Sequence, residues 1–192
     1  MSGAPGFGKS TVARLLRPSI DDIIIDHDVL ISSLLESGIV SLDQAAKQAY
    51  HLQWAQAQDF ISQGVGSVII DSTCNCPVVL EQGISLAARH GYIYWYVECK
   101  VADIDLLDRR MRDRQPMASQ RSAVDSPPAA AQGNGARVGE DARALFTGWI
   151  GSPCRLENDS CVIIVYSTSS LDRLREQILK RLSYGCPSKL DH

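Results

Sequence analysis

The sequence feature that most constrains this chain is a glycine-rich stretch at its start, Gly3-Ala4-Pro5-Gly6-Phe7-Gly8-Lys9-Ser10-Thr11. It matches the pattern G-x-x-x-x-G-K-[ST] at every fixed position, and in such loops successive backbone N–H groups converge on the phosphate oxygens of a nucleotide. Gly3, Gly6 and Gly8 are expected to adopt positive φ. Lys9 is expected to reach the β- and γ-phosphates, and the Ser10 hydroxyl to bind Mg²⁺. The alternative is a chance glycine-rich turn, which ordinary residue frequencies make rare. The whole stretch is therefore predicted to bind a nucleotide.

The surroundings of this loop raise a structural question. A helix from Thr11 to Leu16 is expected to follow it, with the positive end of the helix dipole toward the bound anion. A loop of this kind normally also follows a buried β-strand. Here only Met1 and Ser2 precede it. We therefore expect either that the protein starts further upstream or that its first strand is missing, which would leave a poorly stable sheet.

Length and composition favour a single domain over residues 1–192. A chain of 192 residues with 45% hydrophobic content can bury an ordinary core. The formal net charge of −3 argues against a general nucleic-acid coat or a protein that binds anionic membranes. Without a membrane-length apolar run or a signal peptide, a cytoplasmic protein is expected. The six cysteines form no C-x-x-C pair, which predicts reduced thiols and no zinc.

Acidic residues stand at the end of a predicted buried strand, Asp22 to Asp26. In an open parallel sheet, ligands bind beyond the carboxyl ends of the strands, where the loop would hold its phosphates. Asp28 is therefore a candidate general base, with Asp26 in support. The alternative makes Asp28 the N-cap of a helix from Val29 to Leu35 and leaves Asp26 solvated. His27 is expected to be a surface or packing residue.

A second predicted strand, Ser67 to Asp71, also ends in an acid. An aspartate at this position next to a phosphate-binding loop commonly holds Mg²⁺ through water or orients the loop hydroxyl. Asp71 is therefore predicted to act with Ser10 at the metal. The alternative is an aspartate that only forms a turn.

An arginine-rich segment is predicted to form a lid over residues 102–121. Arg110 and Arg114 are one helical turn apart and should project together, so that their guanidinium groups clamp transferring phosphates. The alternative is a solvated helix whose arginines pair with its own aspartates, Asp105, Asp108 and Asp113.

The remaining segments complete an alternation of helices and strands. Helices are predicted from Leu42 to Ile61, from Pro77 to His90, over the short segment from Glu140 to Trp149, and from about Ser170 onward. Strands are predicted at Tyr92–Cys99 and Cys161–Tyr166, and residues 126–139 are predicted to be a flexible insertion. Such alternation behind a phosphate-binding loop predicts a doubly wound α/β fold.

These motifs, taken in order, resemble the AAA-type P-loop kinase-like family, which includes the kinase domain of polynucleotide kinases and the zeta toxins. The similarity covers the loop, the Asp26-His27-Asp28 and Ile69-Ile70-Asp71 strand ends, and the arginines up to about Arg121. It implies a three-layer α/β fold of P-loop NTPase type, with a parallel sheet of strand order 2-3-1-4-5 whose first strand is apparently missing here. It also implies ATP and Mg²⁺ as cofactors, and catalytic roles for Lys9, Asp28, Arg110 and Arg114.

Two functions of different class follow from this reading. The first is a kinase that moves the ATP γ-phosphate to a hydroxyl of an unidentified small molecule or nucleic acid. The second is a nucleotide-binding or ATPase-type switch without efficient phosphoryl transfer. Adenine is favoured over guanine because the sequence has no N-K-x-D motif.

Overall fold

Helices and short parallel strands alternate along the chain, as the sequence predicts for an α/β fold. The computed structural model describes residues 1–20, 22–73, 76–131, 141–152, 154 and 160–185. Its helices are α1 (Lys9–Ile20), α2 (His27–Glu36), α3 (Leu42–Ser62), α4 (Pro77–Arg89), α5 (Ile104–Arg112), α6 (Ala142–Gly151) and α7 (Leu171–Ser183), with a 3₁₀ turn at Ala129–Ala131. Its strands are β1 (Asp22–Asp26), β2 (Ser67–Asp71), β3 (Tyr96–Lys100) and β4 (Val162–Tyr166).

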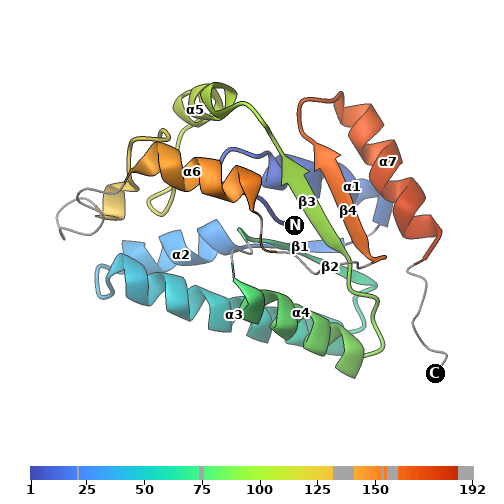
Figure 1. Ribbon diagram of the computed structural model, residues 1–192. Helices are drawn as coiled ribbons and strands as arrows, with labels where there is room; N and C mark the ends of the chain where they lie inside the picture. The colour runs from blue at the N-terminus through green and yellow to red at the C-terminus, as the bar shows by residue number, and fades with distance from the viewer. Residues whose placement is uncertain (21, 74–75, 132–140, 153, 155–159, 186–192) are drawn as a thin grey trace.

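The strands form two separate parallel pairs in the described residues, not one continuous sheet. β1 pairs with β2 in a register that aligns Asp26 with Asp71, and β3 pairs with β4. Between the two pairs lies the start of the chain, where Ser2 forms a single parallel bridge with Glu98 of β3 (Figure 1). The predicted order 2-3-1-4-5 would put one further strand at this place.

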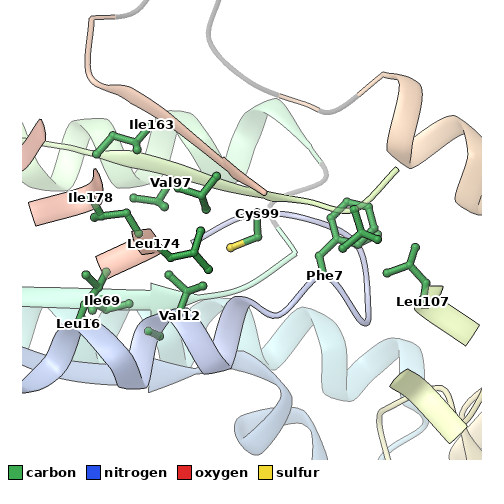
Figure 2. Packing of buried hydrophobic residues seen from close by; sticks show 14 of the residues in the cluster. Phe7, Val12, Leu16, Ile69, Val97, Cys99, Leu107, Ile163, Leu174 and Ile178 are labelled. Atoms are coloured by element: carbon green, nitrogen blue, oxygen red, sulfur yellow. The ribbon is translucent and has the colours of Figure 1, made fainter. Parts of the chain in front are cut away.

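Residues of β2 contribute alternately to two apolar layers, because successive side chains of a strand point to opposite faces. Ile69 belongs to the main core with Val12 and Leu16 of α1, together with residues of β3, β4 and α7. Figure 2 shows Leu16, Ile69, Val97 and Leu174 converging there. Val68 and Ile70 instead pack against a second cluster that includes residues of α3 and α4. Helices therefore cover both faces of the strands.

Several element boundaries differ from those predicted. α1 begins at Lys9, two residues earlier than expected, and continues through Pro18 to Ile20. β3 begins at Tyr96, later than predicted, and Tyr92 to Trp95 form no strand. The capping box at Ser41 and Gln44 forms as predicted at the start of α3. Of the predicted insertion at 126–139, residues 126–131 include a short 3₁₀ turn with Ala131 buried, and 132–139 lie outside the described residues.

The arginine-rich helix is shorter than the predicted lid. α5 ends at Arg112, with Asp113 as its C-cap, so residues 113–121 are not helical. Asp103 caps its start by accepting hydrogen bonds from the backbone N–H groups of Asp105 and Leu106. The helix packs through Leu107 and Met111, both fully buried, on the glycine-rich loop.

The cysteines correct one expectation. Cys76, Cys99 and Cys154 are free thiols, whereas Cys161 is disulfide-bonded, so the prediction that all thiols are reduced is wrong. Burial raises the pKa of the Cys99 thiol to about 11, so this thiol is protonated at neutral pH. In the described part of the chain, no helix is both long and apolar enough to cross a membrane.

Replacing Leu107 by alanine is expected to lower the free energy of unfolding by about 2–5 kcal/mol, because it leaves a cavity in a close-packed core. The matched control is Leu171→Ala, whose side chain is 50% exposed and whose loss should matter little. Urea unfolding of both variants measures the difference. Equal stability of the two variants would contradict the packing of α5 on the loop.

Candidate nucleotide-binding site

The glycine-rich loop has the backbone geometry predicted for it. Gly3, Gly6 and Gly8 have φ of +132°, +83° and +86°. At Gly3 a side chain is also sterically excluded, since a Cβ there would lie 2.6 Å from the Cys99 carbonyl oxygen. At Gly8 a Cβ would lie 3.3 Å from Cβ of Ser167, in the loop between β4 and α7. The loop therefore comes close to β3 on one side and to the β4–α7 loop on the other.

Not every residue of the loop faces the nucleotide side. Ala4 and Phe7 are buried in the main core, where Phe7 lies near Cys99 and Leu107 (Figure 2). Their side chains therefore anchor the loop to the core. Thr11 is exposed on the first turn of α1. The Lys9 Nζ donates a hydrogen bond to the Ala4 carbonyl oxygen at 3.3 Å, so the ammonium group folds back over the loop.

Arg110 lies beside the same loop. Its guanidinium group donates two hydrogen bonds of 2.9 Å to Ser167, one to the hydroxyl and one to the backbone carbonyl oxygen. Because Ser167 approaches Gly8, Arg110 connects α5 to the part of the β4–α7 loop that lies beside the glycine-rich loop. The sequence gives no signal for Ser167, which becomes part of the site only through the packing of β4 against β3.

Arg114 does not project together with Arg110, because α5 ends before it. Arg114 instead donates a hydrogen bond to the Arg121 carbonyl oxygen at 3.2 Å. Burial lowers the pKa of Arg114, and the nearby Asp28 carboxylate partly opposes this effect. The predicted clamp by two adjacent arginines is therefore wrong in its geometry: Arg110 faces the β4–α7 loop and Arg114 the side of Asp28.

Two other arginines of this segment, Arg112 and Arg121, have structural partners. Arg112 pairs with Asp108 at 2.6 Å and with Asp125 at 3.0 Å on the surface, as the solvated-helix alternative predicts for this residue. Arg121 is buried, donates a hydrogen bond to the Val124 carbonyl oxygen and lies 5.8 Å from the ring centre of Phe146.

The N-cap of α2 is Asp26, and not Asp28 as the capping alternative predicts. α2 begins at His27, and Asp26 is its N-cap, accepting a hydrogen bond from the Asp28 backbone N–H at 3.0 Å. The pKa of Asp26 is raised, mainly by burial and also by the neighbouring Asp71 and Asp28 carboxylates. Asp28 is thus free of a capping role, and Asp26 is half-buried, not solvated.

A glutamine that sequence reasoning missed holds the Asp28 side chain. The Gln120 amide donates a hydrogen bond to Asp28 Oδ2 at 2.7 Å, and the neighbouring Ser119 hydroxyl donates to the Asp28 carbonyl oxygen at 3.2 Å. Ser119 also contacts the Ser32 hydroxyl at 2.9 Å. Residues 113–121 therefore dock on α2 and fix the orientation of the Asp28 carboxylate. These contacts span about ninety residues of sequence, and no local pattern announces them.

Asp71, which the sequence predicts to act at a metal, lies at the carboxyl end of β2. It is buried, aligned with Asp26 across the β1–β2 pair, and its Oδ2 has no hydrogen-bond partner among the described residues. Carboxylate and hydroxyl oxygens are the donors that Mg²⁺ prefers, and the ion usually keeps several waters and phosphate oxygens as further ligands. Within the described residues no three His, Cys, Asp or Glu side chains form a metal cage. The unpartnered Asp71 oxygen and the Ser10 hydroxyl are oxygen donors of the kind that Mg²⁺ takes, and their role at a metal stays a prediction.

His27 is a packing residue, buried with its ring centre 4.1 Å from that of Tyr50. Burial lowers its pKa, although the Asp28 and Asp71 charges and Gln53 act in the opposite direction. Below about pH 6.5 the His27 imidazole is protonated in the unfolded chain, whereas in the folded chain it stays neutral down to a lower pH.

We therefore expect wild-type stability to fall as the pH drops from about 7 through 6.5 toward the lower folded pKa. His27→Gln should remove part of this dependence, whereas His51→Gln, at an exposed position of α3, should retain it. Thermal unfolding between about pH 5.5 and 7.5 measures the slopes. Identical slopes in wild type and His27→Gln would contradict the expectation.

Comparison with known proteins gives the family and the fold. Residues 1–133 match the family described as "AAA domain". No curated protein sequence matches the chain. Among solved structures, a candidate kinase from Chloroflexus aurantiacus J-10-fl superposes with a TM-score of 0.68 at 16% identity, covering 96% of this chain and 94% of that one.

Two further structures have the same fold. The APS kinase of Mycobacterium tuberculosis, solved with AMPPNP and APS, has a TM-score of 0.55 at 16% identity and covers 95% of this chain and 94% of its own. A gluconokinase from Sinorhizobium meliloti 1021 has a TM-score of 0.55 at 14% identity, with coverage of 95% and 89%. The family match covers residues 1–133, which is more than half of the chain. The chain therefore belongs to the AAA domain family, and it has the fold of P-loop kinases.

Proposed function

We propose that this protein is an ATP-dependent phosphotransferase that moves the γ-phosphate of ATP to a hydroxyl group of a small molecule. The observation that carries the proposal is the side chain of Asp28, which Gln120 holds at the carboxyl end of β1 while Arg110 sits beside the glycine-rich loop. A pure binding loop needs neither an oriented carboxylate nor a positioned arginine. The fold shared with APS kinase and gluconokinase supports a small-molecule acceptor over a nucleic acid.

Each site residue has a proposed role. The loop backbone from Gly3 to Thr11 binds the phosphates, and Lys9 leaves the Ala4 carbonyl oxygen to contact the β- and γ-phosphates. Ser10 and Asp71 would hold Mg²⁺, which neutralises charge on the phosphates when bound. Asp28 accepts the proton of the attacking hydroxyl.

The two arginines have different proposed roles. Arg110 holds the β4–α7 loop against the nucleotide side of Gly8, so it supports ATP binding. Arg114 lies on the side of Asp28 and stabilises charge that develops on the transferring group. Its partial burial strengthens that interaction, because the local dielectric is low.

The proposal is tested by measuring ATP consumption in the presence of each member of a panel of hydroxyl compounds and oligonucleotides. A phosphotransferase should consume ATP much faster when its acceptor is present, with one phosphorylated product per ATP. A nucleotide-binding switch would bind ATP with no acceptor effect, and slow hydrolysis alone across the whole panel would favour it. If only oligonucleotides stimulated ATP consumption, the acceptor would be a nucleic acid and not a small molecule.

Separate effects are expected from the two arginines. Arg114→Ala should lower kcat about 10²-fold with ATP affinity nearly unchanged, since the interaction is made in the transition state. Arg110→Ala should also weaken ATP binding, because it releases the β4–α7 loop. Arg112→Ala is the matched control, as the Arg112 side chain is 53% exposed and pairs with Asp108 and Asp125. Calorimetry measures the ATP affinity and steady-state kinetics measures kcat. If all three variants kept the wild-type affinity and kcat, the alternative of a solvated helix would be favoured.

A further inference from the structure

Gln53 is a polar side chain on the buried face of α3. The other buried residues of this helix are alanines at every fourth position, Ala45, Ala49 and Ala57. Gln53 continues their line and is 0% exposed. Neither its amide oxygen nor its amide nitrogen has a hydrogen-bond partner of normal geometry among the described residues. Buried polar groups in folded proteins nearly always have partners, and a buried amide without them lowers stability. Gln53 is therefore a candidate for binding a ligand.

The Gln53 side chain lies beside the residues that carry the proposed base. Tyr50 stands one helical turn before Gln53, so their side chains share a face of α3. The Tyr50 ring centre lies 4.1 Å from that of His27, which directly precedes Asp28 in α2. Burial lowers the pKa of His27, and the Asp28 charge and the nearby Gln53 side chain oppose this effect. The Gln53 amide is therefore at the same end of the strands as Asp28.

The unpartnered atoms at this end of the strands require both hydrogen-bond donors and acceptors. The Gln53 amide oxygen and Asp71 Oδ2 can only accept hydrogen bonds, whereas the Gln53 amide nitrogen can only donate them. The carboxylate or phosphate of an anionic ligand supplies acceptors alone and would leave the Gln53 oxygen without a donor. A hydroxyl group both donates and accepts, so two neighbouring hydroxyls can pair with both ends of one amide.

The charges near Gln53 also favour an uncharged ligand. Three carboxylates lie together here, since burial raises the pKa of Asp26 and the Asp71 and Asp28 charges raise it further. Two arginines lie near these carboxylates. Arg14, which is 71% exposed, is 4.0 Å from Asp26, and Arg114 lies on the side of Asp28. The described residues at this end of the strands therefore have no surplus of positive charge that would attract an anionic acceptor.

We propose that Gln53 binds the phosphate acceptor, and that the acceptor is an uncharged compound with neighbouring hydroxyl groups, namely a sugar or a polyol. This inference rests on the phosphotransferase function proposed above and names its substrate class. The Gln53 amide oxygen accepts a hydrogen bond from one hydroxyl, and the amide nitrogen donates to the next. A further hydroxyl gives its proton to Asp28 while its oxygen bonds to the γ-phosphorus. The bond between the γ-phosphorus and the bridging oxygen breaks, and ADP leaves with the electron pair.

Matched sets of acceptors on one carbon skeleton test the substrate class. Each set holds an aldose, its polyol, its sugar acid and its sugar phosphate, and acceptor-dependent ATP consumption gives kcat/KM. The best uncharged acceptor should exceed its anionic counterparts by about 10²-fold or more, because like charges repel in a desolvated site. Deoxy analogues that lack either hydroxyl bound by Gln53 should lose about 10²-fold or more. A sugar acid or phosphate as the best acceptor would overturn the inference and leave the phosphotransferase function standing. No stimulation by any compound would overturn both.

Gln53→Met tests the role of the amide, because methionine keeps the length of the side chain and removes both polar atoms. With the best uncharged acceptor, kcat/KM should fall by about 10- to 100-fold, mainly through KM, while Mg·ATP affinity stays at the wild-type value. The Tm should rise by about 2–4 °C, because an unpartnered buried amide is lost. The matched control is Gln56→Met at an exposed position of α3, which should change none of these values. A lower Tm with an unchanged KM for the acceptor would show that Gln53 is a structural residue and would overturn its assignment.

Discussion

Lys9→Ala is expected to abolish tight binding of Mg·ATP. The lysine ammonium contacts the β- and γ-phosphates in loops of this type, and losing such a charge-assisted contact costs about 2–4 kcal/mol. This corresponds to a Kd about 30- to 1000-fold higher. Among the described residues, Lys9 donates one hydrogen bond, to the Ala4 carbonyl oxygen at 3.3 Å, so the substitution removes little from the fold. Titration calorimetry with Mg·ATP measures the loss.

The matched control is Lys47→Ala, at an exposed position of α3. It should bind ATP as the wild type does, and both variants should keep the wild-type Tm. Ser10→Ala should instead weaken the dependence on Mg²⁺ more than the affinity for the nucleotide. Wild-type affinity in Lys9→Ala would show that the glycine-rich loop is not the nucleotide site, and the proposed function would fail with it.

Asp28→Asn is expected to lower the rate of phosphoryl transfer by about 10²–10⁴-fold. The asparagine keeps the shape of the side chain and an oxygen that can accept the hydrogen bond from Gln120. It loses the basic oxygen that takes the proton of the acceptor hydroxyl. Because the N-cap of α2 is Asp26, the substitution leaves the cap intact. Stability and ATP affinity should therefore stay close to those of the wild type.

Asp43→Asn is a suitable control, because Asp43 is the second residue of α3 as Asp28 is the second residue of α2, and it is exposed. It should turn over at the wild-type rate. Single-turnover kinetics on the identified acceptor separates the chemical step from product release. Full turnover by Asp28→Asn would end the assignment of Asp28 as the base, while leaving nucleotide binding by the loop untouched.

The sequence by itself determined the features that depend on local backbone chemistry. Gly3 and Gly8 stand at the two fixed glycine positions of the loop and Gly6 lies between them, and all three have the expected positive φ. The apolar runs ending in Asp26 and Asp71 predict buried strands, and the Ser41–Gln44 capping box predicts the start of a helix. Such signals are readable because each lies within a few residues of chain.

Only the tertiary structure decided which side chains meet. The end of α5 at Arg112 separates Arg110 from Arg114, although their spacing suits one helical face. Ser167 joins the site because β4 pairs with β3, and Gln120 joins it because residues 113–121 dock on α2. Contacts between residues far apart in sequence are fixed by packing of the whole chain, for which a short pattern carries no information.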